Sequence, residues 1–298
     1  MGIEFSAHQV QPGPYEFSSF GPFYFFDRPL YNDIVRLSLI AMAAIIIFSI
    51  AAWFFFIREE RSFNSEEVAV PQESMTVERV EFAAQDGVKI VGDYYPPIGE
   101  IQVMNGASRG VILLHMMPSH RKSWVALAEK LRQTGLPVLA IDLRGHGESQ
   151  GGPEGYKSFS DSEHQNSRLD VIAAALFLRS KRVDEFHLVG ASIGANLALQ
   201  YLAEHPNARS AILLSPGLDY RGVKTGEAIQ KILTGRGVYL VASDDDQYSR
   251  DTVNELASRI TLDEKHRLKI LESGGHGTTI FENHPEFMDE LVEWLTKL

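Results

Sequence analysis

One serine in this chain lies in the sequence setting of an exposed nucleophile. Residues 190–194, Gly-Ala-Ser-Ile-Gly, fit Gly-x-Ser-x-Gly, the sharp strand-to-helix turn that presents a serine hydroxyl. Residues 186–189 before it predict a short buried strand, and residues 195–202 after it predict a helix. The glycines allow strand and helix to approach closely. Ser192 is therefore the candidate nucleophile for attack on a carbonyl group.

A serine hydroxyl needs a base, and the base needs a carboxylate to orient it. After a turn of this kind, the chain order is serine, acid, histidine. His276 lies between two glycines after an apolar stretch, so it is the candidate base. The run Asp244-Asp245-Asp246 follows another apolar stretch. Asp246, deepest in its loop, is the preferred carboxylate, and Asp245 and Asp244 stay open as alternatives.

The oxyanion that forms during acyl transfer needs two backbone N–H donors. Ile193, the residue after the nucleophile, is expected to supply one. The other is expected from the loop at residues 115–118, His-Met-Met-Pro, in which Pro118 has no N–H. Met117 is the predicted donor and Met116 the alternative. The two methionine side chains could line an acyl pocket or fill the core.

The other histidines are assigned supporting roles. His146 lies in the loop at residues 142–149, Asp-Leu-Arg-Gly-His-Gly-Glu-Ser, where the glycines turn the backbone and Arg144 is expected to bridge loops. His115 and His120 are expected to be hydrogen-bonded supports near the oxyanion loop. None of the ten histidines has a recognised zinc spacing to another histidine or a carboxylate, so no metal and no cofactor are predicted.

Composition narrows the class of protein. The chain has 298 residues, of which 44% are hydrophobic, enough for one large core, or for one domain and an appendage. Its formal net charge of −11 argues against a nucleic-acid partner. Cysteine is absent, which excludes disulfides and thiolate metal sites but leaves the cellular compartment open.

Apolar stretches alternate with helical patterns in the second part of the chain. This alternation predicts an α/β fold with a mostly parallel sheet covered on both faces, in which active sites lie at the carboxyl ends of the strands. The turn Asp86-Gly87 joins the first two strands, so that edge is expected to be antiparallel. Eight strands are predicted, at residues 76–82, 88–95, 110–115, 137–142, 186–189, 210–215, 237–242 and 267–271. Further helices are predicted around 124–131 and at 171–178, 227–233, 253–260 and 287–295.

A long uncharged stretch precedes this part. Residues 37–57 carry no charged side chain, and about 20 such residues cross a hydrocarbon core of about 30 Å. Residues 34–58 are therefore predicted to be a transmembrane helix, which makes this a single-pass membrane protein. A cleavable signal peptide and a buried helix are the alternatives, but the apolar run starts late and is long. Two arginines flank it on each side, so the side of the membrane on which the domain lies is undecided.

Residues 1–33 form an aromatic-rich tail interrupted by proline and glycine. One interpretation is a juxtamembrane tail in the lipid headgroup region, and the other is a docking segment for another membrane protein, because aromatic residues are enriched at interfaces. Residues 59–74 are polar and are predicted to be a linker, and the soluble domain is expected at residues 75–298.

Together, the turn at residues 190–194, the loop at 142–149 and Gly275-His276-Gly277, in this order, resemble the α/β-hydrolase superfamily. The loop is similar to that of the branch with monoacylglycerol lipases and serine aminopeptidases. The resemblance covers residues 75–298 and implies an eight-stranded sheet and a triad of Ser192, Asp246 and His276 that acts through an acyl-enzyme.

The chain departs from this resemblance at two places. Met116 stands where many relatives have glycine, which leaves the second oxyanion donor in doubt. Many relatives carry a large cap after the sixth strand, whereas only residues 216–236 separate two strands here. A minimal cap predicts an open site that accepts exposed or membrane-presented substrates.

The sequence thus predicts a membrane-anchored serine hydrolase that cleaves carboxylic esters, with lipids and acylglycerols among the candidate substrates. The alternative is a non-catalytic accessory subunit of a membrane complex that keeps a hydrolase fold. The aromatic tail favours the alternative, and the presence of all three triad residues favours the enzyme.

Overall fold

The computed structural model describes residues 42, 46, 49 and 76–298. The predicted tail, transmembrane helix and linker fall outside the described residues, apart from those three positions. Within the part of the chain that is described, no helix combines the length and the apolar character needed to cross a bilayer. The chain divides into two units, Met1–Ala69 and Val70–Leu298, and every element given below belongs to the second.

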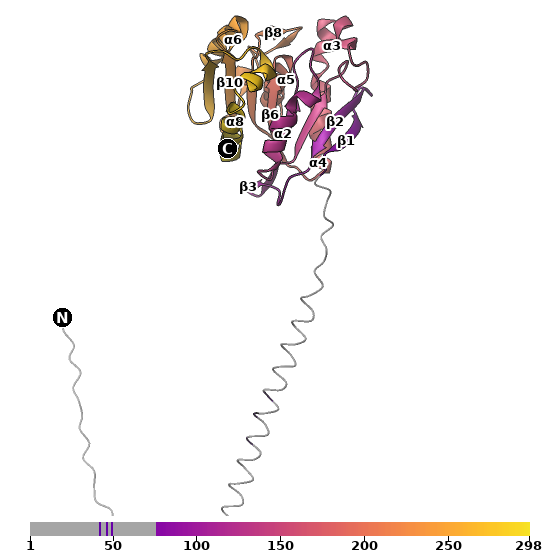
Figure 1. The fold of residues 1–298 in the computed structure, drawn as a ribbon, viewed down its shortest axis with the longest axis vertical. Helices are drawn as coiled ribbons and strands as arrows, with labels where there is room; N and C mark the ends of the chain where they lie inside the picture. Colours follow the sequence, from indigo (N-terminus) through magenta and orange to yellow (C-terminus); the bar gives the residue numbers. More distant parts are fainter. Residues whose placement is uncertain (1–41, 43–45, 47–48, 50–75) are drawn as a thin grey trace, which may run out of the picture. The chain divides into compact units, whose positions relative to one another are not determined.

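A central sheet organises this unit (Figure 1). Its strand order is β1-β2-β5-β4-β6-β7-β10-β11, and short β3 pairs with β4 alone. β1 pairs antiparallel with β2 and β2 with β5, whereas every neighbour from β5 to β11 is parallel. The strands are β1 (Glu78–Ala83), β2 (Lys89–Tyr95), β3 (Val103–Met104), β4 (Ala107–Leu114), β5 (Val138–Asp142), β6 (Glu185–Ala191), β7 (Ala208–Leu214), β10 (Gly237–Ser243) and β11 (His266–Leu271). All eight predicted strands are present, with the predicted antiparallel edge.

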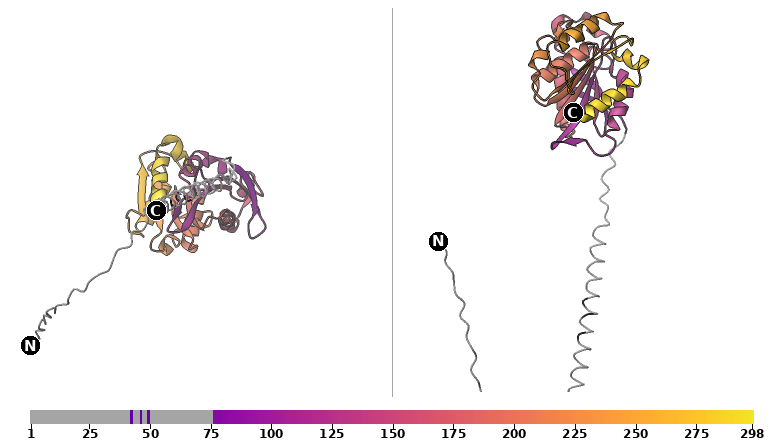
Figure 2. Two further views of the ribbon diagram at one scale, coloured as in Figure 1. Left: turned by 90° about the horizontal axis from the view of Figure 1, so that it is seen from below. Right: turned by 90° about the vertical axis from the view of Figure 1, so that its left-hand side faces the viewer.

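Helices cover both faces of the sheet (Figures 1 and 2). On one face, α4 (Arg168–Ser180), α5 (Ile193–Glu204) and α6 (Gln247–Ala257) share a buried apolar cluster with the strands. On the other, the cluster includes residues of α2 (Val125–Arg132), α7 (Ile280–Asn283) and α8 (Phe287–Lys297). The inner parallel strands β4, β5, β6, β7 and β10 are therefore nearly all buried, because each has apolar neighbours above and below it, whereas the edge strand β11 is only partly buried. The remaining short helices are η1 (Arg121–Trp124), η2 (Gly155–Ser158), α3 (Asp161–Gln165) and η4 (Gly277–Thr279).

The segment between β7 and β10 differs from its prediction. Instead of a helix at residues 227–233, it forms a hairpin of β8 (Asp219–Tyr220) and β9 (Val223–Lys224), followed by the single 3₁₀ turn η3 (Ile229–Lys231). Gly226 and Gly235 bracket a stretch too short to nucleate a stable α-helix, and one turn is enough to bury Ile229. The cap is therefore as small as predicted but is built from a hairpin.

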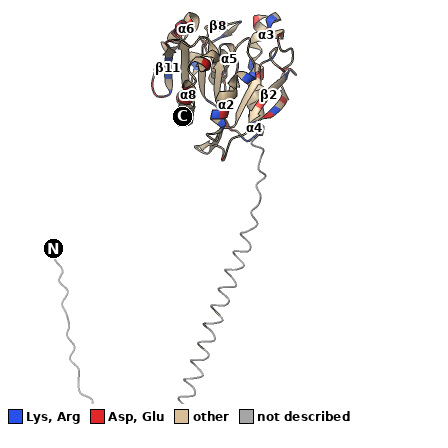
Figure 3. Cartoon of the chain, in the orientation of Figure 1, with Lys and Arg blue, Asp and Glu red and all other residues tan. Residues whose placement is uncertain are grey.

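Charged residues of both signs lie on the same elements of the domain, for example on β2 and α2 (Figure 3). A buried ionic group joins β2 to the segments that follow β4 and β5. Arg121, only 3% exposed, contacts Asp93, Asp142 and Glu148. Its backbone N–H also donates to Asp142 over 2.7 Å. Removing this guanidinium would leave the buried carboxylate of Asp142 without a cationic partner, which costs on the order of 3–5 kcal/mol, whereas Asp93 keeps Lys122 at 2.7 Å.

Three buried histidines make the stability of the fold depend on pH. Burial lowers the pKa of His115 and His187 to about 3 and that of His146 to about 4. An unfolded histidine titrates near pH ~6.5, so below that pH the unfolded chain binds more protons. We expect the free energy of unfolding to be highest above pH ~6.5 and to fall as the pH is lowered to about 5. The slope is up to ~1.4 kcal/mol per pH unit for each histidine.

Urea denaturation of the wild type and of His187→Gln, at pH 7 and pH 5, measures this dependence. His187 lies in β6, and the only hydrogen bond of its ring in the described part of the chain joins Nδ1 to Ser210 Oγ over 2.7 Å. The variant should lose part of the slope whatever its absolute stability. An identical slope in both proteins would contradict the neutral, buried state of His187.

Candidate active site

Ser192 lies in the turn between β6 and α5, as the pentapeptide predicts. Its φ of +54° places a non-glycine residue in the strained left-handed region, which requires support from the surroundings. A β-carbon at Gly190 would overlap the carbonyl group of Gly194. A β-carbon at Gly194 would overlap the Leu114 carbonyl oxygen and lie 2.7 Å from that of His115. Both glycines are therefore required for β6, α5 and the end of β4 to approach one another.

The His276 loop packs beside this turn. The Ser192 N–H donates to the carbonyl oxygen of Leu214, the last residue of β7, over 2.8 Å. The next residue, Ser215, accepts a hydrogen bond from the Gly277 N–H through its hydroxyl over 2.9 Å. A β-carbon at Gly277 would lie 3.4 Å from that of Ala191, the residue before the serine. Ser192, after β6, and His276, after β11, are thus held close together at the carboxyl ends of strands, although β7 and β10 separate those two strands in the sheet.

The three consecutive aspartates have three different partners. Asp246 Oδ2 lies 2.6 Å from His276 Nδ1. Asp245 instead accepts hydrogen bonds from the backbone N–H groups of Gly274, over 3.3 Å, and Gly275, over 3.1 Å. Asp244 pairs with Arg250 at 2.9 Å. The structure therefore brings the preferred carboxylate to the base, and it gives its neighbour the separate task of shaping the loop that carries His276.

Asp246 is held as a carboxylate. Burial acts to raise its pKa, but hydrogen bonds from His276 and Ser249 outweigh burial, and the pKa lies below its usual value. An ionised oxygen at hydrogen-bond distance from Nδ1 keeps a proton on that nitrogen, so Nε2 is the basic atom of the ring. This is the tautomer that a general base needs.

The residues proposed for the oxyanion site also lie at the turn. Ile193 is the first residue of α5, whose first N–H groups have no partner within the helix. Among the described residues, none accepts a hydrogen bond from the N–H of Ile193, Met116 or Met117. His115 orders the methionine loop, because Nδ1 bonds to the Met116 carbonyl over 2.9 Å and Nε2 accepts the Leu143 N–H over 3.0 Å. The N–H groups are free, and the choice between the two methionines stays a prediction.

The loop at residues 142–149 is structural. The His146 ring stacks on Tyr156 at 4.1 Å between centroids, and its Nδ1 bonds to the Arg144 carbonyl. Arg144 joins Asp86 and Asp170, so it bridges loops as expected. The exposed His120 accepts the Lys122 N–H at the start of η1, the supporting role predicted for it.

A tyrosine that the sequence did not single out covers the site. Ser192 is only 5% exposed, so the site is not as open as the short cap suggested. Tyr220, in β8, has its ring edge-on to His276 at 6.1 Å between centroids. Its hydroxyl lies 3.2 Å from Ser249 Oγ and interacts with the Ser192 side chain. Only the folding of the hairpin reveals this position, because no motif surrounds Tyr220.

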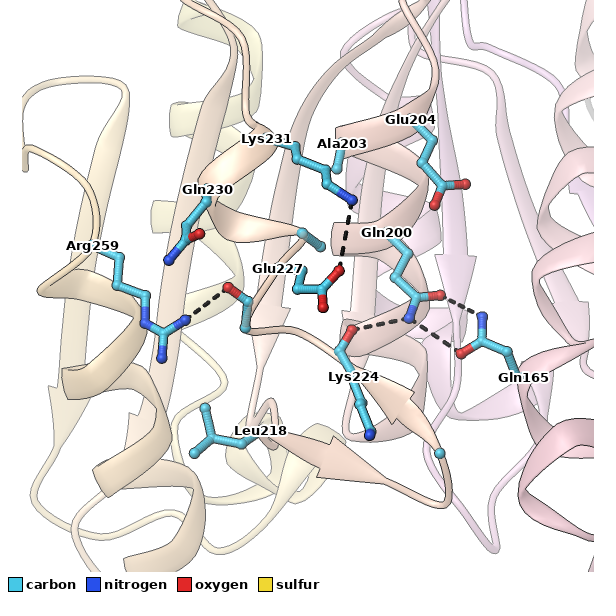
Figure 4. A pocket seen from close by; sticks show the side chains of 13 residues that line it. Gln165, Gln200, Ala203, Glu204, Leu218, Lys224, Glu227, Gln230, Lys231 and Arg259 are labelled. Carbon is cyan, nitrogen blue, oxygen red and sulfur yellow. Dashed lines mark hydrogen bonds and ion pairs between the residues drawn. The ribbon is translucent and has the colours of Figure 1, made fainter.

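A separate cavity of about 550 Å³ lies beside the hairpin and contains none of the three predicted catalytic residues (Figure 4). Several of its polar groups already have partners: Gln200 pairs with Gln165, and Arg259 donates to the Gly226 carbonyl. Because these groups already have partners, the cavity is a weaker candidate for chemistry than the turn at Ser192. Within residues 76–298, no group of three or more histidine or acidic side chains is arranged to hold a metal ion.

Known proteins share this architecture. Residues 110–235 match the family model described as alpha/beta hydrolase fold. The structure is similar to that of the esterase Pf2001 of Pyrococcus furiosus, with a TM-score of 0.59 and 21% sequence identity, over 75% of this chain and 93% of the esterase. This chain has the α/β-hydrolase fold. The order β1-β2-β5-β4-β6-β7-β10-β11 and the serine turn after β6 are thus features of a hydrolase scaffold.

Curated relatives of this hydrolase fold include lipases. A monoacylglycerol lipase of Mycolicibacterium smegmatis is 31% identical over 135 residues, which are 45% of this chain and 44% of the relative. Monoacylglycerol lipase abhd6-B of Xenopus laevis is 29% identical over 109 residues, 37% of this chain and 30% of the relative. The chain therefore spans less than half the length of these relatives.

The different partners of two adjacent aspartates give a matched test. The Asp246→Asn substitution removes the negative charge beside His276, so the side chain at position 246 no longer keeps the proton on Nδ1. We expect kcat for ester hydrolysis to fall about 10²–10⁴-fold. Asp245→Asn keeps an oxygen that can accept the Gly274 and Gly275 N–H groups, and kcat should change less than about tenfold. Equal losses in the two variants, both with wild-type circular dichroism, would contradict the assignment.

Proposed function

We propose that this chain is a serine hydrolase that cleaves carboxylic esters through an acyl-enzyme. The observation that carries the proposal is the 2.6 Å contact between Asp246 Oδ2 and His276 Nδ1, on a loop packed against the turn of Ser192. An oriented imidazole beside a serine in a strained turn is the arrangement that makes a hydroxyl nucleophilic.

In the proposed reaction, Ser192 Oγ attacks the ester carbonyl while His276 Nε2 accepts its proton. The imidazolium is stabilised by Asp246, and the oxyanion by the N–H groups of Ile193 and Met117. His276 then delivers the proton to the departing alkoxide, which leaves as an alcohol and gives the acyl-enzyme. Water, activated by the same histidine, attacks the acyl-enzyme and releases the carboxylic acid.

The proposed substrates are esters of fatty acids with small alcohols, including acylglycerols. Two lines of support converge: the matched relatives are named monoacylglycerol lipases, and the cap consists of a small hairpin rather than a large domain. Since the chain covers less than half of those relatives, the substrate class is a proposal about this chain and not a property carried over from them.

A fluorophosphonate probe tests the reaction itself. The wild type should be labelled on Ser192, and Ser192→Ala should not be labelled, because only an activated serine attacks the phosphorus centre at neutral pH. Ser210→Ala serves as a control that should still be labelled, since Ser210 is also a buried serine but its hydroxyl pairs with His187 inside the sheet. If well-folded wild type takes up no label, the proposed enzymatic function is wrong, and the alternative of an accessory subunit with a hydrolase fold is favoured.

Membrane attachment through residues 37–57 is proposed on sequence grounds alone, because the stretch lies almost wholly outside the described residues. The full chain should sediment with membranes and resist an alkaline wash, whereas a fragment of residues 76–298 should stay in the supernatant. Release of the full chain by the wash would contradict a spanning helix.

A partner protein bound by the tail would co-purify with the detergent-solubilised full chain and be lost when residues 1–30 are deleted.

A further inference from the structure

The hairpin between β7 and β10 is tied to the helix that carries the nucleophile. The fully buried amide of Asn196, one turn after Ser192 in α5, donates to the carbonyls of Gly217, over 2.9 Å, and Val223, over 2.7 Å. Its oxygen accepts the Gly217 N–H over 3.0 Å. Both ends of the hairpin are therefore fastened by one side chain, so the hairpin has a defined position above the site.

Tyr220 is held in that hairpin from two further sides. A β-carbon at Gly217 would lie 2.7 Å from the Tyr220 ring and 2.8 Å from the Tyr248 ring, so both rings pack onto a glycine that leaves space for them. The Tyr248 hydroxyl bonds to the backbone N–H and carbonyl of Asp219, each over 3.3 Å. Tyr248 also meets the Tyr220 ring edge-on at 5.6 Å. A side chain fixed in this way acts as a wall rather than as a mobile cover.

The position of the wall relative to the base indicates which half of a substrate meets it. In the proposed reaction His276 delivers its proton to the departing alkoxide, so the alcohol part of the ester must lie next to His276. Among the described residues, the aromatic ring that packs edge-on against His276 is that of Tyr220. The proposed oxyanion donors lie at Ile193 and Met117, whereas the Tyr220 ring meets the ring of His276.

We propose that Tyr220 determines leaving-group specificity, its ring limiting the size of the alcohol that can lie between Ser192 and His276. The inference rests on the proposed function and names the substrate half that this site selects. Burial raises the pKa of the Tyr220 hydroxyl to about 12, so the group stays protonated and neutral at physiological pH. The ring, and not a charge, then sets the limit.

Butyrate esters of ethanol and cyclohexanol, hydrolysed by the same full-length preparation, test this inference because their acyl groups are identical. In Tyr220→Ala, kcat/KM for the cyclohexyl ester relative to the ethyl ester should rise about tenfold or more. The relative rates of ethyl acetate, butyrate and hexanoate should stay within about twofold of the wild type. A ratio taken on one preparation is independent of how much of the variant is folded.

Two further variants distinguish the effect of the Tyr220 ring on this ratio from the effects of its hydroxyl group and of the hairpin. Tyr220→Phe keeps the wall, so its cyclohexyl-to-ethyl ratio should match the wild type. Tyr248→Phe removes the hydroxyl that bonds to Asp219 but keeps the ring that packs edge-on against Tyr220, so the ratio should rise less than in Tyr220→Ala. If Tyr220→Ala does not fold, Tyr220→Leu, which keeps an apolar but smaller side chain, should raise the ratio in the same direction.

Phosphonylation of Ser192 gives a second measurement that needs no turnover. Two phosphonates with the same phosphonyl group but different leaving groups, fluoride and 4-nitrophenoxide, are compared by mass spectrometry of the intact protein. Tyr220→Ala should accelerate the reaction of the 4-nitrophenyl reagent relative to the fluoride. Wild type that reacts with both reagents, together with an unchanged ratio in the variant, would overturn this inference alone. Wild type that reacts with neither would overturn the proposed function with it.

Discussion

The close approach of two backbones at Gly194 is the constraint on which the rest of the site depends. The first turn of α5 lies so close to the carbonyls of Leu114 and His115 that no side chain fits between them. This contact sets the turn after β6 directly against the loop after β4. Ser192, the proposed nucleophile, and the free N–H groups of the methionine loop are thereby brought close together. Any side chain at position 194 would push the two loops apart, so the pentapeptide supplies the glycine needed for this close contact as well as the serine.

Around that contact, hydrogen bonds at strand ends join loops that are distant in the chain. Ser192 is bonded to the end of β7, Ser215 to the backbone of Gly277, and Asp245 to the backbone of Gly274 and Gly275. The first bond uses the backbone N–H of Ser192 and the other two involve neighbours of His276 and Asp246, so these three bonds do not occupy the proposed catalytic side chains. The Asp246 side chain has both a structural and a proposed catalytic role, because it caps α6 through the Ser249 N–H and also contacts His276.

The prediction of the fold succeeded where a residue pattern is compatible with only one kind of structure. Continuous apolar stretches must lie between two layers of helices, so all eight strands and the antiparallel edge could be read from the chain. The prediction of a helix at residues 227–233 failed because that segment is short, and its conformation is decided by contacts made elsewhere. Asn196 fastens the hairpin that precedes this segment, and the local sequence does not indicate that a buried amide on α5 makes three hydrogen bonds to the backbone of the cap.

The sequence by itself determined the order of the elements, the serine turn with its two required glycines, and the short list of acid and base candidates. These are local properties, set by periodicity and by the space that a residue type needs. The choice among three adjacent aspartates, and the placement of Tyr220 over Ser192, were decided only by the tertiary structure. Both depend on which loops meet at the carboxyl ends of β6, β7, β10 and β11, and such distances are set by the packing of the whole sheet.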